Sequence, residues 1–283
     1  MIKIIADTTS VIDLDEATRL GITLVPQLIV FGEKSYRDEY EISTEEFLSK
    51  LKSSSTLPKT AAPSPAFYAE AYAKIAQAKD TAIVICPSTQ ISGTYRSATV
   101  AAQDYPDADI RIVDTFTIGP ALGTLVIKAK EWADAGADAQ TIIDRLNAAK
   151  VFNKIYFYVD TLEYLHKGGR IGAAQALLGS ILQVKPILAF INDKVSFFSQ
   201  RTKRLALDRL VELVKEDCPH NIHAHFALFQ ADAMADALLL KEKFESLLGL
   251  DSIQISKIPP AMIVHVGPGV VAVSYFTEFP GEL

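Results

Sequence analysis

Short apolar runs and amphipathic stretches alternate along the first half of the chain. The apolar runs are rich in Ile and Val, which is typical of buried strands, whereas the amphipathic stretches have the spacing of helices. Strands are expected at residues 2–7, 22–32, 81–88 and 109–115, and helices at 14–21, 92–103, 119–136 and 138–151. Strands that alternate with helices indicate βαβ units, so this half is expected to contain a largely parallel sheet.

Two further helices are marked by the residues at their starts. Ser43 is followed three residues later by Glu46, which is the spacing of a capping box. Ser64 and Pro65 mark the second start, because proline fits the first position of a helix, where its missing N–H is not needed. The segment before it, LPKTAAPSP (57–65), is expected to be a loop.

The second half of the chain changes character. Strands are expected at 154–160, 223–229, 252–258 and 269–276, helices at 202–217 and 231–248, and a hairpin at 186–200 that turns at Asn192-Asp193. This pattern predicts a mixed α+β arrangement. We therefore expect an α/β protein with an N-terminal domain at 1–150 and a C-terminal domain at 151–283.

Composition narrows the function classes. The chain has 283 residues and a net charge of −6, which argues against a nucleic-acid-binding protein, since such proteins usually carry a basic excess. No apolar run reaches the roughly 18 residues of a transmembrane helix. The N-terminal MIKIIADTTS lacks the features of a signal peptide, and Cys86 and Cys218 lack CxxC spacing. A cytoplasmic protein is expected.

Polar residues gather where the expected strands end. The clusters are Asp7-Thr8-Thr9-Ser10, residues 88–94, Asp114-Thr115-Phe116-Thr117 and Asp160-Thr161. Ligands of open parallel sheets bind beyond the carboxyl ends of the strands. Ser92-Gly93-Thr94, at a helix start, offers hydroxyl and backbone N–H groups that suit an anion. The alternative is that these residues only cap helices, which Ser, Thr and Asp do well.

The familiar nucleotide, metal and hydrolase motifs are missing. The chain has no GxxxxGK[ST] or GxGxxG, so neither phosphate-loop fingerprint is present, no HExxH or Cys/His cluster offers a metal site, and no GxSxG marks a hydrolase nucleophile. His265 follows the apolar run 261–264, expected as a strand, and precedes Gly267-Pro268-Gly269. That position makes it a candidate site residue, although a single histidine is more often structural. His223 and His225 are expected to share one face of a strand.

The stretch TLEYLHKGGRIG (161–172) is explained only in part as the end of a helix. Lys167 in a last helical turn, followed by Gly168 at the left-handed position, is a common helix end. A helix end does not explain why Gly169, Arg170 and then a nearly uncharged run follow.

Several segments together resemble the DegV family of bacterial fatty-acid-binding proteins, the FakB-type carriers of fatty acid kinase. The segments that carry the resemblance are DTTSVIDL, TAAPSPAFY, ISGTYRSA, VDTFTIGPALG, VDTLEYLHKGGRIG, SQRTKR and HVGPGVVAVSY, in the family's order along the whole chain. The resemblance implies two α/β domains with a long-chain fatty acid buried between them, and no cofactor.

The resemblance also implies residue roles. Thr60 and Ser92, with Gly93 and Thr94 beside Ser92, would hold the carboxylate, and His265 would belong to the same polar network. Arg170 and Arg201 are similar to arginines associated with the head group and with docking of the kinase. This chain has Thr60-Ala61-Ala62 where the family usually has Thr-Ser-Gln, so Ala61 removes one hydroxyl and leaves Thr60 as the main candidate in that segment.

The function expected from this resemblance is that of a carrier rather than an enzyme. It would bury a fatty acid and present the carboxylate to a separate ATP-dependent kinase, which makes the acyl phosphate for phospholipid synthesis. Gly168 and Gly169 would hinge a helix at 171–184 that covers the acyl tail and touches a membrane surface transiently; a plain buried helix is the alternative. Rival functions are a hydrolase or transferase using Ser92 and His265, and a regulatory lipid-sensing protein.

Overall fold

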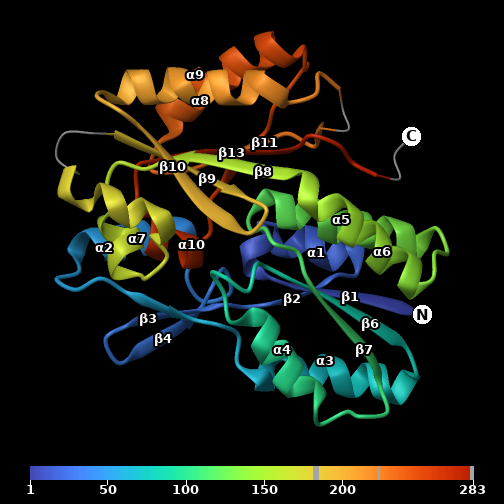
Figure 1. The fold of residues 1–283 in the computed structure, drawn as a ribbon. Helices are drawn as coiled ribbons and strands as arrows, with labels where there is room; N and C mark the ends of the chain where they lie inside the picture. The colour runs from blue at the N-terminus through green and yellow to red at the C-terminus, as the bar shows by residue number, and fades with distance from the viewer. Residues whose placement is uncertain (181–184, 222–223, 281–283) are drawn as a thin grey trace.

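The computed structural model describes residues 1–180, 185–221 and 224–280, and two large sheets dominate it (Figure 1). A four-stranded sheet has the order β2-β1-β6-β7 and is parallel throughout. A six-stranded sheet has the order β10-β9-β8-β13-β11-β12 and is mixed, since only β11 and β12 pair in parallel. The α/β class expected from the sequence is confirmed.

The parallel sheet lies between two layers of helices. Its strands are β1 (Ile2–Asp7), β2 (Thr23–Val25), β6 (Thr81–Cys86) and β7 (Asp109–Asp114). The helices are α1 (Leu14–Leu20), α3 (Pro65–Ala78), α4 (Thr94–Ala102), α5 (Pro120–Asp134) and α6 (Ala139–Ala149), with short 3-10 turns at η1 (Thr8–Ser10) and η2 (Lys150–Phe152). In Figure 1, α3 and α4 cover the lower face, whereas α1, α5 and α6 lie between the two sheets. The alternation of strand and helix predicted these elements, except that the single strand expected at 22–32 is divided into β2 and a second strand at Leu28–Phe31, which belongs to another sheet.

A small antiparallel sheet stands beside the parallel one and was not predicted as a sheet. It consists of β4 (Lys34–Arg37), β3 (Leu28–Phe31) and β5 (Lys59–Ala61), and α2 (Thr44–Ser53) follows β4 in the chain. Thr60 therefore lies on a strand paired with Ile29, not in the expected loop. Backbone pairing fixes this residue more firmly than a loop would.

Helices cover one face of the six-stranded sheet, and the other face is turned toward the N-terminal half of the chain. Its strands are β8 (Asn153–Tyr158), β9 (Lys185–Ile191), β10 (Lys194–Gln200), β11 (Ala227–Ala231), β12 (Ile255–Lys257) and β13 (Val270–Phe276). Helices α8 (Lys203–Asp217) and α9 (Met234–Leu248) cover the outer face (Figure 1). On the inner face Ala272 pairs with Phe157 on one side and Phe229 on the other. A small side chain between two phenylalanines leaves a trough in that face.

Several local expectations need correction. Residues 261–264 belong to a helix, α10 (Pro260–Val266), because Pro259-Pro260 starts it and an apolar run this short does not distinguish strand from helix. The helix α7 (Glu163–Lys167) ends with Gly168 still right-handed, and the left-handed residue is Gly169. His225 precedes β11 rather than lying on it, and His223 falls outside the described residues.

Two further expectations concern the second half. The hairpin is confirmed, with Asn192 and Asp193 both at positive φ, as a tight two-residue turn requires. The helix expected at 171–184 is a 3-10 segment, η3 (Gly172–Ser180), as far as the structure describes it, and 181–184 fall outside the described residues.

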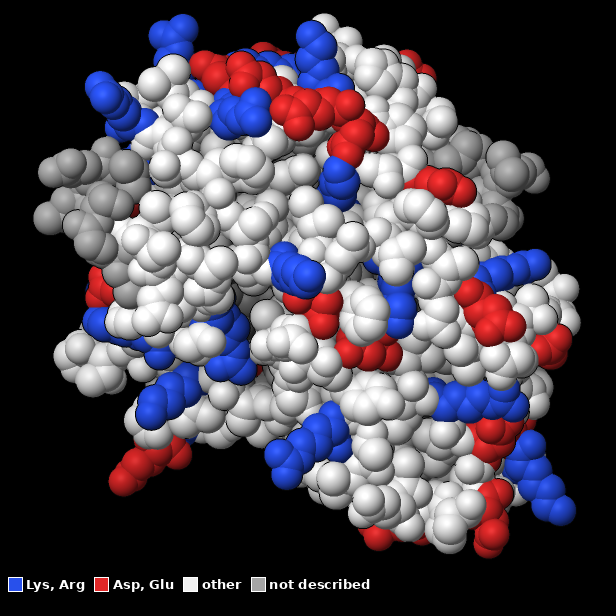
Figure 2. Space-filling view, in the orientation of Figure 1, with Lys and Arg blue, Asp and Glu red and all other residues white. Residues whose placement is uncertain are grey.

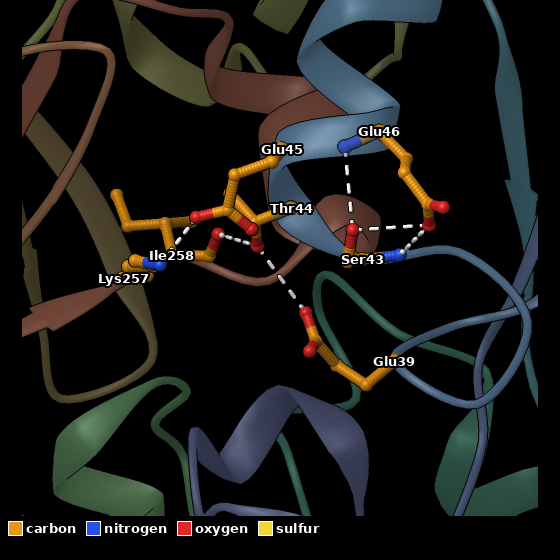
Figure 3. A network of polar contacts seen from close by, with 7 residues as sticks. All are labelled: Glu39, Ser43, Thr44, Glu45, Glu46, Lys257 and Ile258. Atoms are coloured by element: carbon orange, nitrogen blue, oxygen red, sulfur yellow. Dashed lines mark hydrogen bonds and ion pairs between the residues drawn. The ribbon is translucent and has the colours of Figure 1, made fainter.

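The two halves are joined by packing and by polar contacts. Phe276 and Phe279 pack into the core formed by α5 and α6, so one hydrophobic core includes residues from both sides of residue 150. The domain boundary at residue 150 stays a prediction. At the start of α2, the Thr44 hydroxyl lies 3.1 Å from the Ile258 carbonyl, and Glu45 pairs with Lys257 (Figure 3). The capping box is present: Ser43 Oγ accepts from the Glu46 N–H, and the Glu46 carboxylate accepts from the Ser43 N–H.

Ser43→Ala is expected to lower the free energy of unfolding by about 1 kcal/mol, because it removes one half of this box. Urea denaturation measures the change. Ser49→Ala, at an exposed position of the same helix, serves as the control and should change stability by only a few tenths of that amount. Equal effects of the two variants would contradict the importance of the cap.

Candidate functional site

A pocket lies where the strand ends of the N-terminal half face the inner side of the six-stranded sheet. Its polar lining consists of Thr9, Gln27, Thr60, Ser92, Arg170 and His265. Its apolar lining comes largely from the sheet and includes Ile155, Phe157, Phe190, Val195, Phe229 and Ala272. The space between atoms amounts to about 1030 Å³, which includes open solvent at the mouth. The pocket thus combines a polar wall with an apolar sheet face.

Thr60 and His265 form a direct pair in the pocket wall. Thr60 Oγ1 lies 2.7 Å from Nε2 of His265, and Nδ1 of the same ring is buried without a hydrogen-bond partner. Burial, together with the nearby Arg170 guanidinium, lowers the pKa of His265 to about 4, so the ring is neutral at pH 7. Either atom of the Thr60–His265 pair can donate, depending on which ring nitrogen carries the proton.

Arg170 and Gly168 shape the surroundings of His265. Arg170 donates from Nε to the Ile91 carbonyl (3.1 Å) and from Nη1 to the Gly168 carbonyl (2.7 Å), so its guanidinium is held at the pocket wall. Gly168 is needed for close packing, because a Cβ there would overlap Nδ1 of His265 and lie 2.9 Å from the Tyr164 carbonyl. Gly169, at φ +70°, has open space around it and ends the helix.

Ser92 and Gly93 reach the pocket, but Thr94 does not. Gly93 is the N-cap of α4, and its α-carbon approaches Ala62 so closely that a Cβ would lie 3.3 Å from the Ala62 Cβ. Ser92 lies in the pocket wall, whereas Thr94 is fully buried behind it, with its Oγ1 2.9 Å from Ser92 Oγ. The three residues are therefore neighbours in different layers of the site.

Sequence analysis did not identify two side chains that hydrogen-bond to Thr94, those of Gln27 and Asp7. Gln27, between β2 and β3, lines the pocket and donates from Nε2 to Asp7 (2.6 Å) and to Thr94 Oγ1 (2.8 Å). Asp7 is fully buried; it also accepts from Thr94 Oγ1 (2.7 Å) and from the N–H and hydroxyl of Thr9. Burial raises the pKa of Asp7, against the opposing effect of these hydrogen bonds. Asp7 belonged to a noted cluster, but nothing in the sequence pointed to Gln27.

A second buried carboxylate positions the helix that carries His265. Asp38 is fully buried, accepts from Thr8 Oγ1 (2.6 Å) and from the Ala261 N–H in the first turn of α10 (3.1 Å). Burial raises its pKa to about 7. Asp38 thus links the end of β1 to α10.

The second predicted arginine lies apart from the pocket. Arg201 is exposed in the link between β10 and α8 and does not line the cavity. Figure 2 shows Lys and Arg side chains around a hollow on one face, between the regions of α7 and α4. In the described part of the chain no three or more His, Cys, Asp or Glu residues are grouped as metal ligands, and no helix is both long and apolar enough to cross a membrane.

Known proteins resemble this chain over almost its whole length. A family model described as "Uncharacterised protein, DegV family" matches residues 1–278. A DegV domain-containing protein of Streptomyces coelicolor is 35% identical over 96% of this chain and 97% of that protein.

Two solved structures are similar to this chain over almost its whole length. One, described as fatty acid binding of a DegV family protein from Thermus thermophilus, is 27% identical over 97% of this chain and 99% of that one, with a TM-score of 0.88. The other, described as DegV, a fatty acid binding protein from Bacillus subtilis, is 29% identical over 97% and 99%, with a TM-score of 0.85.

Asp38→Asn is expected to gain stability relative to the parent protein as the pH rises from 5 to 8. Asp38 stays protonated in the fold up to about pH 7, whereas its ordinary pKa is 3.8, so the folded parent loses stability across this range. Asparagine is neutral throughout and retains an acceptor for the Ala261 N–H. Melting curves should show a relative gain in Tm of several degrees, since 1 kcal/mol shifts Tm by roughly 2 °C at this length.

His265 does not confound this comparison. Its lowered pKa gives the opposite trend, because stability rises with pH between about 4 and its ordinary value of 6.5, but both proteins contain it. Asp107→Asn, at an exposed loop position, is the matched control. A Tm difference for Asp38→Asn that stays constant with pH would show that Asp38 is already ionised in the fold.

Gly168→Ala is expected to destabilise the protein by about 1–3 kcal/mol and to displace the His265 ring, because the added methyl group overlaps Nδ1. Gly169→Ala is the control: it meets no atom within 4 Å and carries only the cost of a left-handed alanine, about 1 kcal/mol. NMR signals of the His265 ring should shift in the first variant and stay unchanged in the second. Unshifted signals in both would exclude the close contact.

Proposed function

The chain belongs to the DegV family, and we propose that it binds one long-chain fatty acid in the pocket described above. The carboxylate lies against Ser92, Thr60 and His265, and the acyl tail runs over the inner face of the six-stranded sheet. The observation that carries the proposal is the pocket itself, in which a set of polar groups meets an otherwise apolar wall. The fatty-acid-binding descriptions of the Thermus and Bacillus structures support it.

Tail and head have different physical roles in this proposal. A saturated sixteen-carbon acid has about 14 methylenes, and their burial contributes on the order of 11 kcal/mol before losses, at roughly 0.8 kcal/mol each. Ordering of the tail and loss of rigid-body freedom offset much of this. The tail therefore supplies affinity, whereas hydrogen bonds to the head fix how far the molecule slides into the pocket.

The head group is held by neutral donors beside one cation. Ser92 donates its hydroxyl proton, and Thr60 donates its own when the ring proton of His265 is on Nε2, so that Thr60 accepts from the ring. Such bonds to a charged acceptor are stronger than bonds between neutral groups. Arg170 supplies positive charge in the same wall, which lowers the cost of burying a carboxylate.

The geometry favours a carrier over a hydrolase. A Ser-His nucleophile requires the histidine to bond the serine and a third group to orient the ring. Nε2 of His265 contacts Thr60 instead, and Nδ1 has no partner. Neither requirement is met in the described part of the chain.

We extend the proposal to a partner. The carboxylate is presented to a separate ATP-dependent kinase, which makes the acyl phosphate for phospholipid synthesis. The support is the resemblance of the motifs, together with Arg170 in the pocket wall, the exposed Arg201 and the basic side chains around the hollow in Figure 2. A hinge at Gly168 and Gly169 that lets the following segment open toward a membrane stays part of the proposal, although each glycine also has a static reason for being there.

Solvent extraction of the purified protein followed by mass spectrometry is the direct test, and we expect one fatty acid per chain. Ser92→Ala should weaken fatty-acid binding about tenfold, because a hydrogen bond to a charged group is lost. It should also slow acyl phosphate formation with an added fatty acid kinase. Ser49→Ala is the control and should match the parent protein.

Three outcomes would count against this proposal. An empty protein with no affinity for added fatty acids favours the regulatory alternative, and turnover of activated esters favours the hydrolase. Parent-like binding and phosphorylation by Ser92→Ala would remove Ser92 from the head-group site.

A further inference from the structure

Thr94 occupies an unusual position behind the head-group site. Its side chain is fully buried and does not line the pocket, yet three polar side chains converge on its hydroxyl oxygen. Asp7 Oδ2 lies 2.7 Å away, Gln27 Nε2 2.8 Å and Ser92 Oγ 2.9 Å. Only Gln27 and Ser92 of these three reach the pocket.

With Asp7 ionised, the number of donors determines the direction of each hydrogen bond around Thr94. The amide atom of Gln27 that contacts the Asp7 carboxylate is a nitrogen, so the same Nε2 also donates to Thr94. Asp7 receives donors at both oxygens, and the single hydroxyl proton of Thr94 points to its Oδ2. Thr94 can then only accept from Ser92.

Ser92 is therefore attached to Thr94 in two ways. Its hydroxyl donates to Thr94 Oγ1, and its oxygen accepts from the Thr94 N–H at 3.3 Å. When a carboxylate in the pocket accepts the hydrogen bond from Ser92, the Thr94 hydroxyl can turn its own proton from Asp7 to Ser92 Oγ, because Asp7 Oδ2 still accepts from Gln27 and Thr94 Oγ1 still accepts from Gln27. The exchange leaves no buried polar group without a partner, which would otherwise be costly.

We propose that Thr94 is a positioning residue, held by Asp7 and Gln27, that fixes the Ser92 hydroxyl so that the pocket selects a carboxylate over a neutral head group on the same chain. This inference rests on the proposed function. Thr94 does not face the cavity, so it acts on the ligand through its neighbours that do, Ser92 and Gln27, and Ser92 is the one proposed to contact the carboxylate.

Two pairs of residues at position 94 isolate the hydroxyl. Thr94→Val replaces only the hydroxyl by a methyl group, and Thr94→Ser keeps the hydroxyl without the methyl. Thr94→Ala, compared with Thr94→Ser, again differs only in the oxygen and requires no space for a second methyl, so it serves if the valine variant does not fold. Each variant is tested for folding by its thermal melting curve before binding is measured.

Affinity is measured for palmitic acid and for 1-hexadecanol, which share the same tail. Thr94→Val and Thr94→Ala should lower the affinity for the acid about tenfold relative to the alcohol, since the bond to the charged head is weakened. Thr94→Ser should restore the acid-to-alcohol ratio to within about threefold of the parent value. If Thr94 had only a structural role, its replacement would lower the affinity for palmitic acid and for 1-hexadecanol equally.

The outcomes separate this inference from the proposed function. If the parent protein binds neither ligand, the proposed function fails. If the parent binds palmitic acid and the valine and alanine variants keep the parent ratio of acid to alcohol, the positioning role of Thr94 fails while the proposed function stands. Failure of the serine variant to restore the ratio would likewise overturn the inference, because the hydroxyl alone would then not be responsible.

Discussion

The need to satisfy buried carboxylates organises the site. Asp7 and Asp38 are both removed from water, and a buried carboxylate without donors is costly. The chain supplies those donors from distant segments: Gln27 and Thr94 for Asp7, and Thr8 and the backbone of α10 for Asp38. The same bonds that satisfy the two acids also place Ser92 and the helix that carries His265. The polar end of the pocket therefore depends on hydrogen bonding around two buried carboxyl groups.

Sequence pattern predicted the parts of the fold that depend on neighbours in the chain. The strands at the start of the chain and at 81–86 and 109–114 follow from dense runs of β-branched residues, and the Ser43–Glu46 capping box follows from spacing alone. The tight turn at Asn192-Asp193 likewise depends on two adjacent residues that tolerate positive φ. Such signals need no knowledge of tertiary structure.

The errors have a common physical origin in tertiary context. The run before His265 is too short and too uniformly apolar to reveal its period, and only its two prolines mark the helix start. The small sheet of β3, β4 and β5 depends on pairing between Ile29 and Thr60, which no local pattern records. Gln27 was overlooked for the same reason: its partners are 20 and 67 positions away. Thr60, Ser92 and His265 were named from motifs, whereas the way they are held could come only from coordinates.

The alternation of side chains along β13 has a consequence for divergence within the family. Ala272 faces the cavity between two phenylalanines, whereas its neighbours Val271 and Val273 belong to the core beneath α8 and α9. One strand therefore contributes to two separate interiors through alternate residues. Substitutions at every second position of β13 can therefore change the wall of the cavity without changing the core packed against α8 and α9, so pocket shape and thermal stability can diverge independently.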